Sequence, residues 1–162
     1  MAFQINNYGI VSPIGYNGPQ SIVGPAGKDG SARELAYAGT QTPFSTTSAY
    51  DVVAGFVTGL SVTVVGEGLP VEVITFFCGA YSQSAANRGV IPYIANGADP
   101  IAASTVRSPV TSDGPPVTLS ARLVLVKGQS YTFRAGIMGS DVGTSNVFSG
   151  PVNTSYISVM AR

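Results

Sequence analysis

The chain has 162 residues, enough for one domain with a short extension and a substantial hydrophobic core. Eight basic residues balance eight acidic ones, and charged residues make up only 10% of the chain, so it lacks the basic surface that attracts nucleic acid or an anionic membrane. Because it has no histidine, it lacks the commonest general base near neutral pH and the commonest metal ligand.

The first 14 residues hold isolated apolar side chains among asparagine, glycine and proline. This pattern is too irregular to form a core, so we expect the segment to be ordered by docking onto another protein. It lacks the pattern of a secretory signal, and no apolar stretch approaches the ~18 residues of a membrane span, which favours a soluble protein made in a cytoplasm. The candidate docking residues are Phe3, Ile5, Tyr8 and Ile10.

A three-residue glycine period follows, with Ser21 as its single exception. Only glycine fits at the axis of a collagen triple helix, and a proline after glycine suits its polyproline geometry. Because Ser21 would place a side chain on that axis, a long triple helix is excluded. Two interpretations stay open, an irregular linker and a short three-chain collar, and the collar would make the protein a trimer. The candidate trimerisation residues here are Gly15, Gly18, Gly24, Pro25, Gly27 and Gly30.

Residues 31–39 fit two structures. Ser31 followed by Glu34 forms a capping box for a short helix that would end at Gly39. The alternation of Leu35, Tyr37 and Gly39 with alanines fits a β-strand instead. The pattern alone does not separate the two.

From residue 40 onward the sequence predicts β-structure throughout. Alternation places Leu60, Val62 and Val64 on one face of a half-buried strand. The run at residues 70–79 is apolar on both faces after Glu72, which predicts a central strand covered on both sides. Cys78 ends this run, and we expect it to lie in the core.

Three later strands show clear inward faces. These inward faces comprise Leu119, Ala121, Leu123 and Leu125, then Tyr131, Phe133, Ala135 and Ile137, then Ile157, Val159 and Ala161. Weaker strands are predicted at residues 49–57, 89–96 and 104–110, and Pro92 indicates an edge or a bulge. About eight to ten short strands separated by turn residues predict an all-β, antiparallel jelly-roll sandwich.

No motif for chemistry stands out. The sequence has no P-loop, no nucleophile elbow and no Asp-rich calcium loop, so we expect no enzymatic activity and neither a cofactor nor a metal. Tyr156, on the last strand opposite Ile157, is the candidate for a subunit contact, because tyrosine combines apolar area with a hydroxyl group. Ordinary sheet packing is the alternative for this residue.

The stretches "ELAYAGTQTPFSTTSAYDVVAGFVTGLSVTV", "PVEVITFFCGAY", "SDGPPVTLSARLVLVKGQSYTFRAGI" and "SYISVMAR" resemble the small β domain of minor tail and other accessory virion proteins of actinobacterial tailed phages. That domain is similar in layout to the trimeric, tumour-necrosis-factor-like jelly roll. The resemblance covers residues 33–162 and rests most specifically on "LSVTV" and on the "GQSYTF" stretch. It implies that residues 33–39 form the first strand.

The resemblance also implies an organisation and a role. Residues 1–14 would be a virion-attachment arm, residues 15–32 a collagen-like linker or collar, and residues 33–162 the jelly roll of a homotrimer. The expected role is a minor tail or tail-tip protein of the virion that contacts a host-surface glycan. The alternatives are a capsid decoration protein held by the same arm and a soluble, trimeric, lectin-like module. The candidate receptor residues lie in or beside turns and are Tyr81, Asn96, Asp99, Asp141 and Asn146.

Overall fold

The computed structural model describes residues 3–5, 11–13, 33–47, 49–82, 89–107, 114–140, 143–147 and 154–162. The chain divides into two units, Met1–Ser31 and Ala32–Arg162. In the first unit, β1 (Phe3–Ile5) and β2 (Val11–Pro13) pair as antiparallel strands. The predicted anchor residues Phe3 and Ile5 lie in β1, whereas Tyr8, Ile10 and the glycine period lie outside the described residues.

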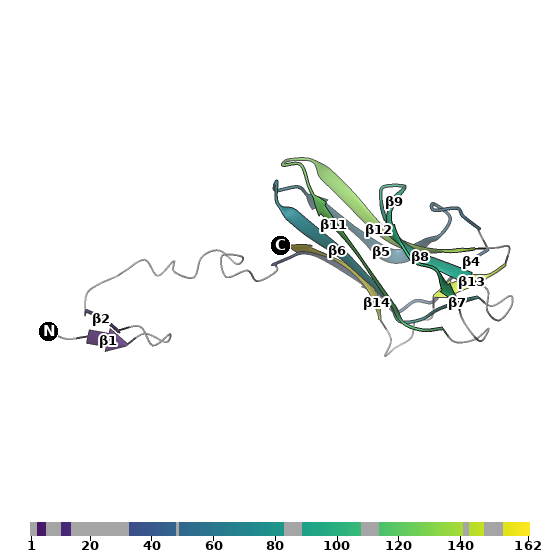
Figure 1. Ribbon diagram of the computed structural model, residues 1–162, viewed down its shortest axis with the longest axis horizontal. Coiled ribbons are helices and arrows are strands. Elements are labelled where there is room, and N and C mark those ends of the chain that lie inside the picture. The colour runs from purple at the N-terminus through teal and green to yellow at the C-terminus, as the bar shows by residue number, and fades with distance from the viewer. Residues whose placement is uncertain are drawn as a thin grey trace. The chain divides into compact units, whose positions relative to one another are not determined.

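The second unit is built from strands and turns (Figure 1). Its strands are β3 (Arg33–Thr40), β4 (Phe44–Thr46), β5 (Phe56–Val65), β6 (Pro70–Phe77), β7 (Ala80–Ser82), β8 (Gly89–Asn96), β9 (Asp99–Ala103), β10 (Val106–Arg107), β11 (Val117–Val124), β12 (Ser130–Gly139), β13 (Ser145–Val147) and β14 (Ser155–Ala161). Within the described ranges, no helix is long and apolar enough to cross a membrane.

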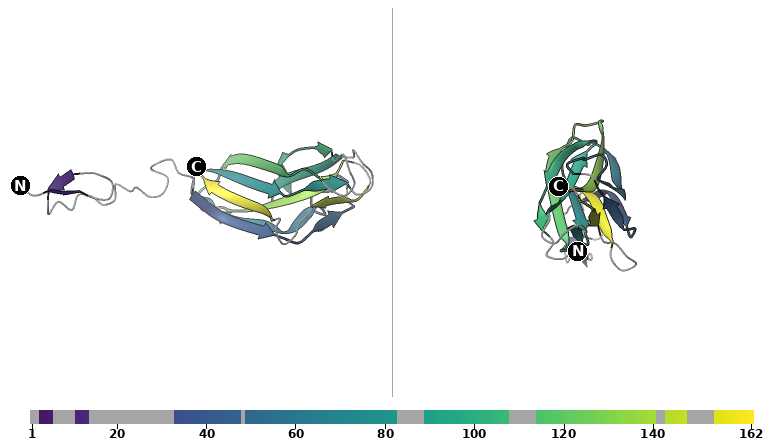
Figure 2. Two further views of the ribbon diagram at one scale, coloured as in Figure 1. Left: turned by 90° about the horizontal axis from the view of Figure 1, so that it is seen from below. Right: turned by 90° about the vertical axis from the view of Figure 1, so that its right-hand side faces the viewer.

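The strands form two main antiparallel sheets and one small sheet (Figure 2). The β14 sheet has the order β11-β6-β14-β3, and the β12 sheet has the order β10-β8-β12-β5 with β9 also paired to β8. The first long strand, β3, pairs with the last, β14, and the second, β5, pairs with the next to last, β12. This nested pairing across two sheets is the jelly roll that the sequence predicted. The small end sheet has the order β4-β13-β7.

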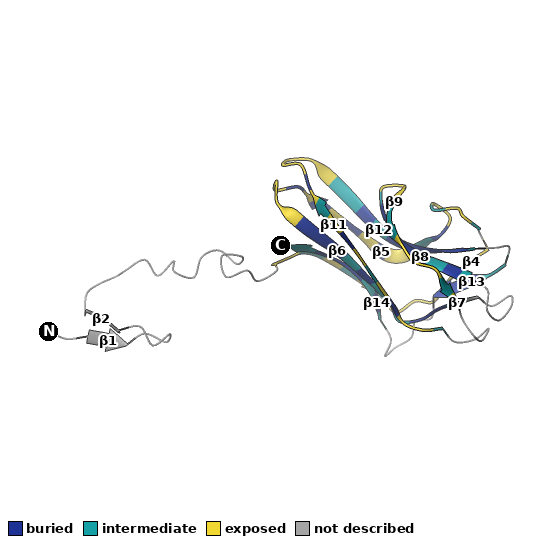
Figure 3. Cartoon of the chain, viewed as in Figure 1, coloured by how far each residue is buried: buried dark blue, intermediate teal, exposed yellow. Residues whose placement is uncertain are grey.

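The core lies between the two main sheets, and Figure 3 shows how far each described residue of their strands is buried. On β5, Leu60, Val62 and Val64 are 0–6% exposed, whereas the intervening Ser61 and Thr63 are exposed. The other predicted inward faces also point into this core, with complete burial of Phe133, Ala135, Ile137, Ile157 and Val159. Period-two alternation therefore identified the buried side of β5, β11, β12 and β14, whereas the outward side of β6, predicted to be covered, carries the half-buried Phe76.

Pro92 lies where the outer neighbour of β8 is interrupted. β9 ends at Ala103 and β10 begins at Val106, and between them the Ser104 amide donates to the Pro92 carbonyl at 3.0 Å. The backbone nitrogen and carbonyl of a strand residue point toward the same neighbouring strand. The nitrogen of Pro92 therefore faces the gap between β9 and β10, where its lack of a hydrogen to donate breaks no strand pairing. The prediction of an edge or a bulge at Pro92 is therefore wrong in detail, because β8 has neighbours on both sides and its pairing with β9 shifts register between Ile94 and Ala95 instead.

Three local predictions need correction. Residues 33–40 form β3, so the short helix suggested by the capping box is wrong, because the alternating residues pair with β14. The strand predicted at residues 49–57 is largely a turn, since Asp51 Oδ1 accepts hydrogen bonds from the amides of Val53 and Ala54 at 3.0 and 3.1 Å. Cys78, which was expected in the core, follows the end of β6 at Phe77 and is only half-buried.

Candidate binding face

The outward side of the β14 sheet carries a row of three aromatic rings. Tyr156 on β14 stacks on Phe76 of β6 with ring centroids 5.6 Å apart, and on Tyr37 of β3 at 5.8 Å. Tyr156 and Phe76 face outward because their neighbours Ile157 and Thr75 point into the core. We call this row, with the side chains around it on the same sheet, the aromatic face.

Gly39 makes room for the stacking. It pairs with Tyr156 across β3 and β14, and a Cβ atom at this position would lie 2.9 Å from the Tyr37 hydroxyl oxygen. Because glycine has no side chain, the Tyr37 ring lies over the strand and beside Tyr156. Tyr37 remains 54% exposed, whereas Tyr156 and Phe76 are half-buried.

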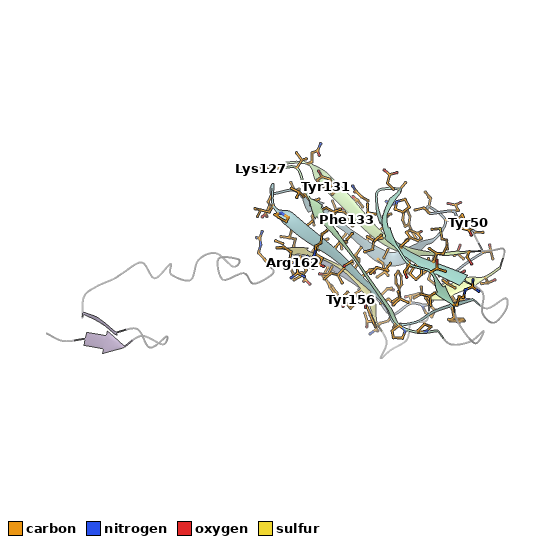
Figure 4. The ribbon with its side chains drawn as sticks, in the orientation of Figure 1. Tyr50, Lys127, Tyr131, Phe133, Tyr156 and Arg162 are labelled. Carbon is orange, nitrogen blue, oxygen red and sulfur yellow. The ribbon has the colours of Figure 1, made fainter. Side chains whose placement is uncertain are left out.

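A shallow pocket of about 340 Å³ adjoins the row. Its lining comprises Glu34, Tyr37, Ile74, Tyr156, Ser158, Met160 and Arg162. The Ser158 hydroxyl donates to Glu34 Oε2 at 3.1 Å. Figure 4 shows the side chains of Tyr156 and Arg162 on this sheet. The pocket thus combines tyrosine rings with a carboxylate and a guanidinium group.

The charges beside the pocket are paired. Glu72 on β6 is only 6% exposed, and its carboxylate binds Arg162 and the Nε of Arg122, the latter at 3.3 Å. The hydrogen bond from Arg162 holds the pKa of Glu72 below its usual value, although burial opposes this shift. With Glu34, two carboxylates balance two guanidinium groups, so the described part of this face has no net charge.

The predicted site residues fall in different places. Tyr156 lies at the centre of the aromatic face. Tyr81 and Asn146 pair directly across β7 and β13 in the end sheet. Asn96 and Asp99 pair with each other beside the turn between β8 and β9, apart from that sheet. Asp141 lies outside the described residues.

Sequence reasoning missed two parts of the face. The strand that holds Phe76 was predicted to be covered on both sides, although the alternation that turns Thr75 and Phe77 inward also turns Phe76 outward. Glu34 was considered only as a helix-cap residue, in one of the two alternatives for residues 31–39. The contact between Glu72 and Arg122 had no sequence signal, because the residues lie 50 positions apart and meet only through the pairing of β6 with β11. No group of three or more potential metal-ligating side chains occurs within the described part of the chain.

No protein-family model matches the chain, and no curated protein matches it significantly. Similar solved structures include the Eiger TNF from S. frugiperda, with 15% identity, a TM-score of 0.39, and coverage of 80% of this chain and 94% of that one. The CBM22-1 xylan-binding domain of Paenibacillus barcinonensis Xyn10C has 13% identity, a TM-score of 0.37 and coverage of 82% of both chains.

The infectious bursal disease virus VP2 subviral particle is also similar, with 10% identity and a TM-score of 0.36. The similarity covers 82% of this chain and 36% of the VP2 chain. At such TM-scores none of these likenesses supports an assignment of function, and the jelly-roll assignment rests on the strand pairing described above.

Proposed function

We propose that the chain is a non-enzymatic structural protein of a phage virion, a homotrimer whose subunits meet through the aromatic face. The observation that supports this most is the exposed ring of Tyr37 stacked against Tyr156 on an outer sheet. Aromatic side chains are enriched at the centres of protein interfaces, where they bury a large apolar area at a small entropic cost. A second copy of the chain would cover this row.

The charge of the chain also favours association between copies. Its net charge is zero, and the carboxylates of the aromatic face are balanced by Arg122 and Arg162. Identical subunits therefore meet without the repulsion that a strongly charged surface would cause.

The two ends of the domain support a minor tail or tail-tip role. β3 begins at Arg33, which pairs with Ala161 near the C-terminus and forms an ion pair with Glu67 at 2.6 Å. The end sheet lies at the opposite end of this domain (Figure 1). A chain segment that precedes Arg33 thus joins the domain at the end away from the end sheet, and we assign the contact with a host surface to that end sheet. Residues 1–14 would supply the virion anchor.

The test measures solution mass by light scattering for the wild type and the double variant Tyr37→Ser/Tyr156→Ser. We expect the wild type to be a trimer and the double variant to be a folded monomer. Tyr50→Ser is the matched control, because Tyr50 is 66% exposed and is not part of the aromatic face. A monomeric wild type, or a double variant that stays trimeric, would exclude this interface.

A second experiment locates the protein on the particle. Antibody labelling of virions in the electron microscope should mark the tail, whereas labelling of the head would establish the capsid-decoration alternative. Virions made with a chain that lacks residues 1–32 should lose the protein. If this truncated chain is still incorporated, the assignment of the anchor to the N-terminal arm is wrong.

The pocket favours one other function, a lectin-like module outside any virion. Tyrosine rings beside a carboxylate and a guanidinium group can stack on a sugar and hydrogen-bond its hydroxyls. This function requires the aromatic face to be free. A monomeric wild type whose sugar binding is lost in Tyr37→Ser would favour it over the trimer.

A further inference from the structure

The pocket of the aromatic face holds a carboxylate without a cation. Glu34 is exposed, accepts a hydrogen bond from Ser158, and forms no ion pair among the residues that the structure describes. The guanidinium groups of Arg122 and Arg162 both bind Glu72 instead. Taking a carboxylate out of water without a cation is strongly unfavourable. A second copy that covers the aromatic face must therefore bring a cation to Glu34.

A ring of three copies uses two different surfaces of each chain. In a cyclic trimer, every contact joins one surface of a chain to another surface of its neighbour. The aromatic face is one of these surfaces, and its pocket includes residues of β3, an edge strand of the β14 sheet. The second surface should be apolar, to match the tyrosine rings, and should carry a cation.

Three cations in the described part of the chain have no carboxylate partner there, and they lie in different places. The guanidinium group of Arg134 lies over the ring of Phe56, with its Cζ atom 5.0 Å from the ring centroid. Arg107 ends β10, which lies beside β7 of the end sheet. Lys127 is exposed in the turn between β11 and β12.

Lys127 is part of an exposed apolar surface. Its turn, residues 125–129, lies against the turn of residues 66–69, because the Gly66 amide donates to the Gln129 carbonyl and the Gly128 amide to the Gly66 carbonyl, both at 2.8 Å. Four aliphatic side chains in and beside these turns are 47–70% exposed, namely Val65, Leu69, Val124 and Val126. We call the two turns with these side chains the apolar turns. Their hydrogen bonds fix their shape in advance, so a contact made here loses little entropy.

The apolar turns and the pocket lie at the same end of the domain. Arg33, which directly precedes Glu34, forms its ion pair with Glu67 of the apolar turns. Figure 4 shows Lys127 and Arg162, which lines the pocket, at this end. The two surfaces belong to opposite edges of the β14 sheet, since β11 leads to Lys127 and β3 carries Glu34.

This arrangement fits a three-fold axis that runs along the domain. In the proposed trimer, the three chains are anchored through the segments that precede Arg33, so these ends all point the same way along the axis. A rotation about the axis carries the apolar turns of one copy to its neighbour without changing their level. They can therefore meet the neighbour's pocket, which lies at that level.

We propose that Lys127 of each copy binds Glu34 of the next copy in the trimer. The ammonium group would donate to the Glu34 carboxylate and lie close to the Tyr37 ring, which attracts a cation. The exposed valines of the apolar turns would pack against the tyrosine rings of the aromatic face. This inference rests on the proposed trimer and names the residue that each copy contributes to its neighbour's pocket.

The test exchanges the two charges and measures trimer dissociation of the full chain by sedimentation equilibrium. Lys127→Glu and Glu34→Lys should each raise the protein concentration at which the trimer dissociates by about tenfold or more, because each places like charges together. The double variant Lys127→Glu/Glu34→Lys restores an ion pair with its charges exchanged, so its dissociation midpoint should return close to that of the wild type.

The controls separate this ion pair from an effect of net charge. Arg107→Glu changes the net charge by the same amount as Lys127→Glu, but it lies beside the end sheet and should leave the midpoint unchanged. Glu34→Lys/Arg107→Glu has the wild-type net charge without the pair, and it should dissociate as readily as Glu34→Lys. Circular dichroism checks that each variant is folded. If Lys127→Glu does not fold, Lys127→Met removes the charge alone and should also weaken the trimer.

The outcomes distinguish this contact from the trimer itself. The contact is excluded, and the trimer retained, if the wild type is trimeric and Lys127→Glu dissociates as the wild type does. The same conclusion follows if the charge exchange fails to restore association, or if Glu34→Lys/Arg107→Glu restores it equally well. A monomeric wild type would exclude the trimer and the contact together.

Discussion

Tyr156 stacks on Phe76 across two paired strands, with ring centroids 5.6 Å apart and ring planes inclined by 27°. The two residues are direct register partners of β14 and β6 on the outward side of a jelly roll. Apolar surface is unfavourable in water, and the proposed trimer contact rests on this outward row of rings.

Gly39→Ala should weaken subunit association without unfolding the domain. The new Cβ would lie 2.9 Å from the Tyr37 hydroxyl oxygen and 3.2 Å from Thr154 Cγ2, so the hydroxyl end of Tyr37 must shift, which disturbs its stacking on Tyr156. Because Tyr37 is a flexible and largely exposed side chain, the fold tolerates this movement. We expect the trimer to dissociate at a higher protein concentration than the wild type, measured by sedimentation equilibrium. An unchanged dissociation midpoint would show that Tyr37 does not contribute to the contact.

Glu72→Gln should destabilise the domain near pH 7 and much less in acid. The pKa of Glu72 is held below its usual value, mainly by the hydrogen bond from Arg162, so its contribution is fully present above the unfolded-state value of 4.5. That contribution is lost as the pH falls through the lowered folded-state pKa. Unfolding temperatures of both proteins between pH 7 and pH 3 should therefore converge at the acid end.

The matched control for this experiment is Glu67→Gln. Glu67 pairs with Arg33, but both side chains are nearly half exposed, so the ion pair contributes at most about 1 kcal/mol. If Glu67→Gln lowers the unfolding temperature as much as Glu72→Gln does, the partly enclosed Glu72 cluster has no special role in stability.

Tyr93→Phe should cost about 1–2 kcal/mol of stability. Tyr93 is fully buried on β8, and its hydroxyl donates to the carbonyl oxygen of Val52 in the turn that precedes β5. Burial raises the pKa of Tyr93, which favours the protonated hydroxyl that donates this hydrogen bond. Urea unfolding measures the change, and a variant as stable as the wild type would show that the Val52 carbonyl finds another donor.

Alternation predicted which side of β5, β11, β12 and β14 is buried, because one face of each sheet meets the core and the other meets solvent. It identified Leu60, Val62 and Val64 correctly. It also suggested a strand near Asp51, where side-chain hydrogen bonds to the backbone form a turn instead. The apolar pattern could not show that hydrogen bonds from the backbone to the Asp51 side chain would compete with strand pairing.

The candidate sites were predicted less completely than the fold. Tyr156 was selected as a tyrosine opposite a buried residue, but its partners Tyr37 and Phe76 became neighbours only through strand pairing. Tyr81 and Asn146 were both chosen as receptor residues, but no sequence pattern indicated that they pair directly across two strands. Contacts across a sheet depend on register between distant segments, which a single sequence does not specify.

The measurement that tests the central claim most directly is the solution mass of residues 32–162 alone, compared with that of the intact chain of 16.5 kDa. If the aromatic face joins the subunits, both proteins should have three times the mass of their own chain. If the truncated protein is a monomer and the intact chain is a trimer, the N-terminal segment and not the aromatic face holds the subunits together. Monomers in both samples would contradict the homotrimer itself.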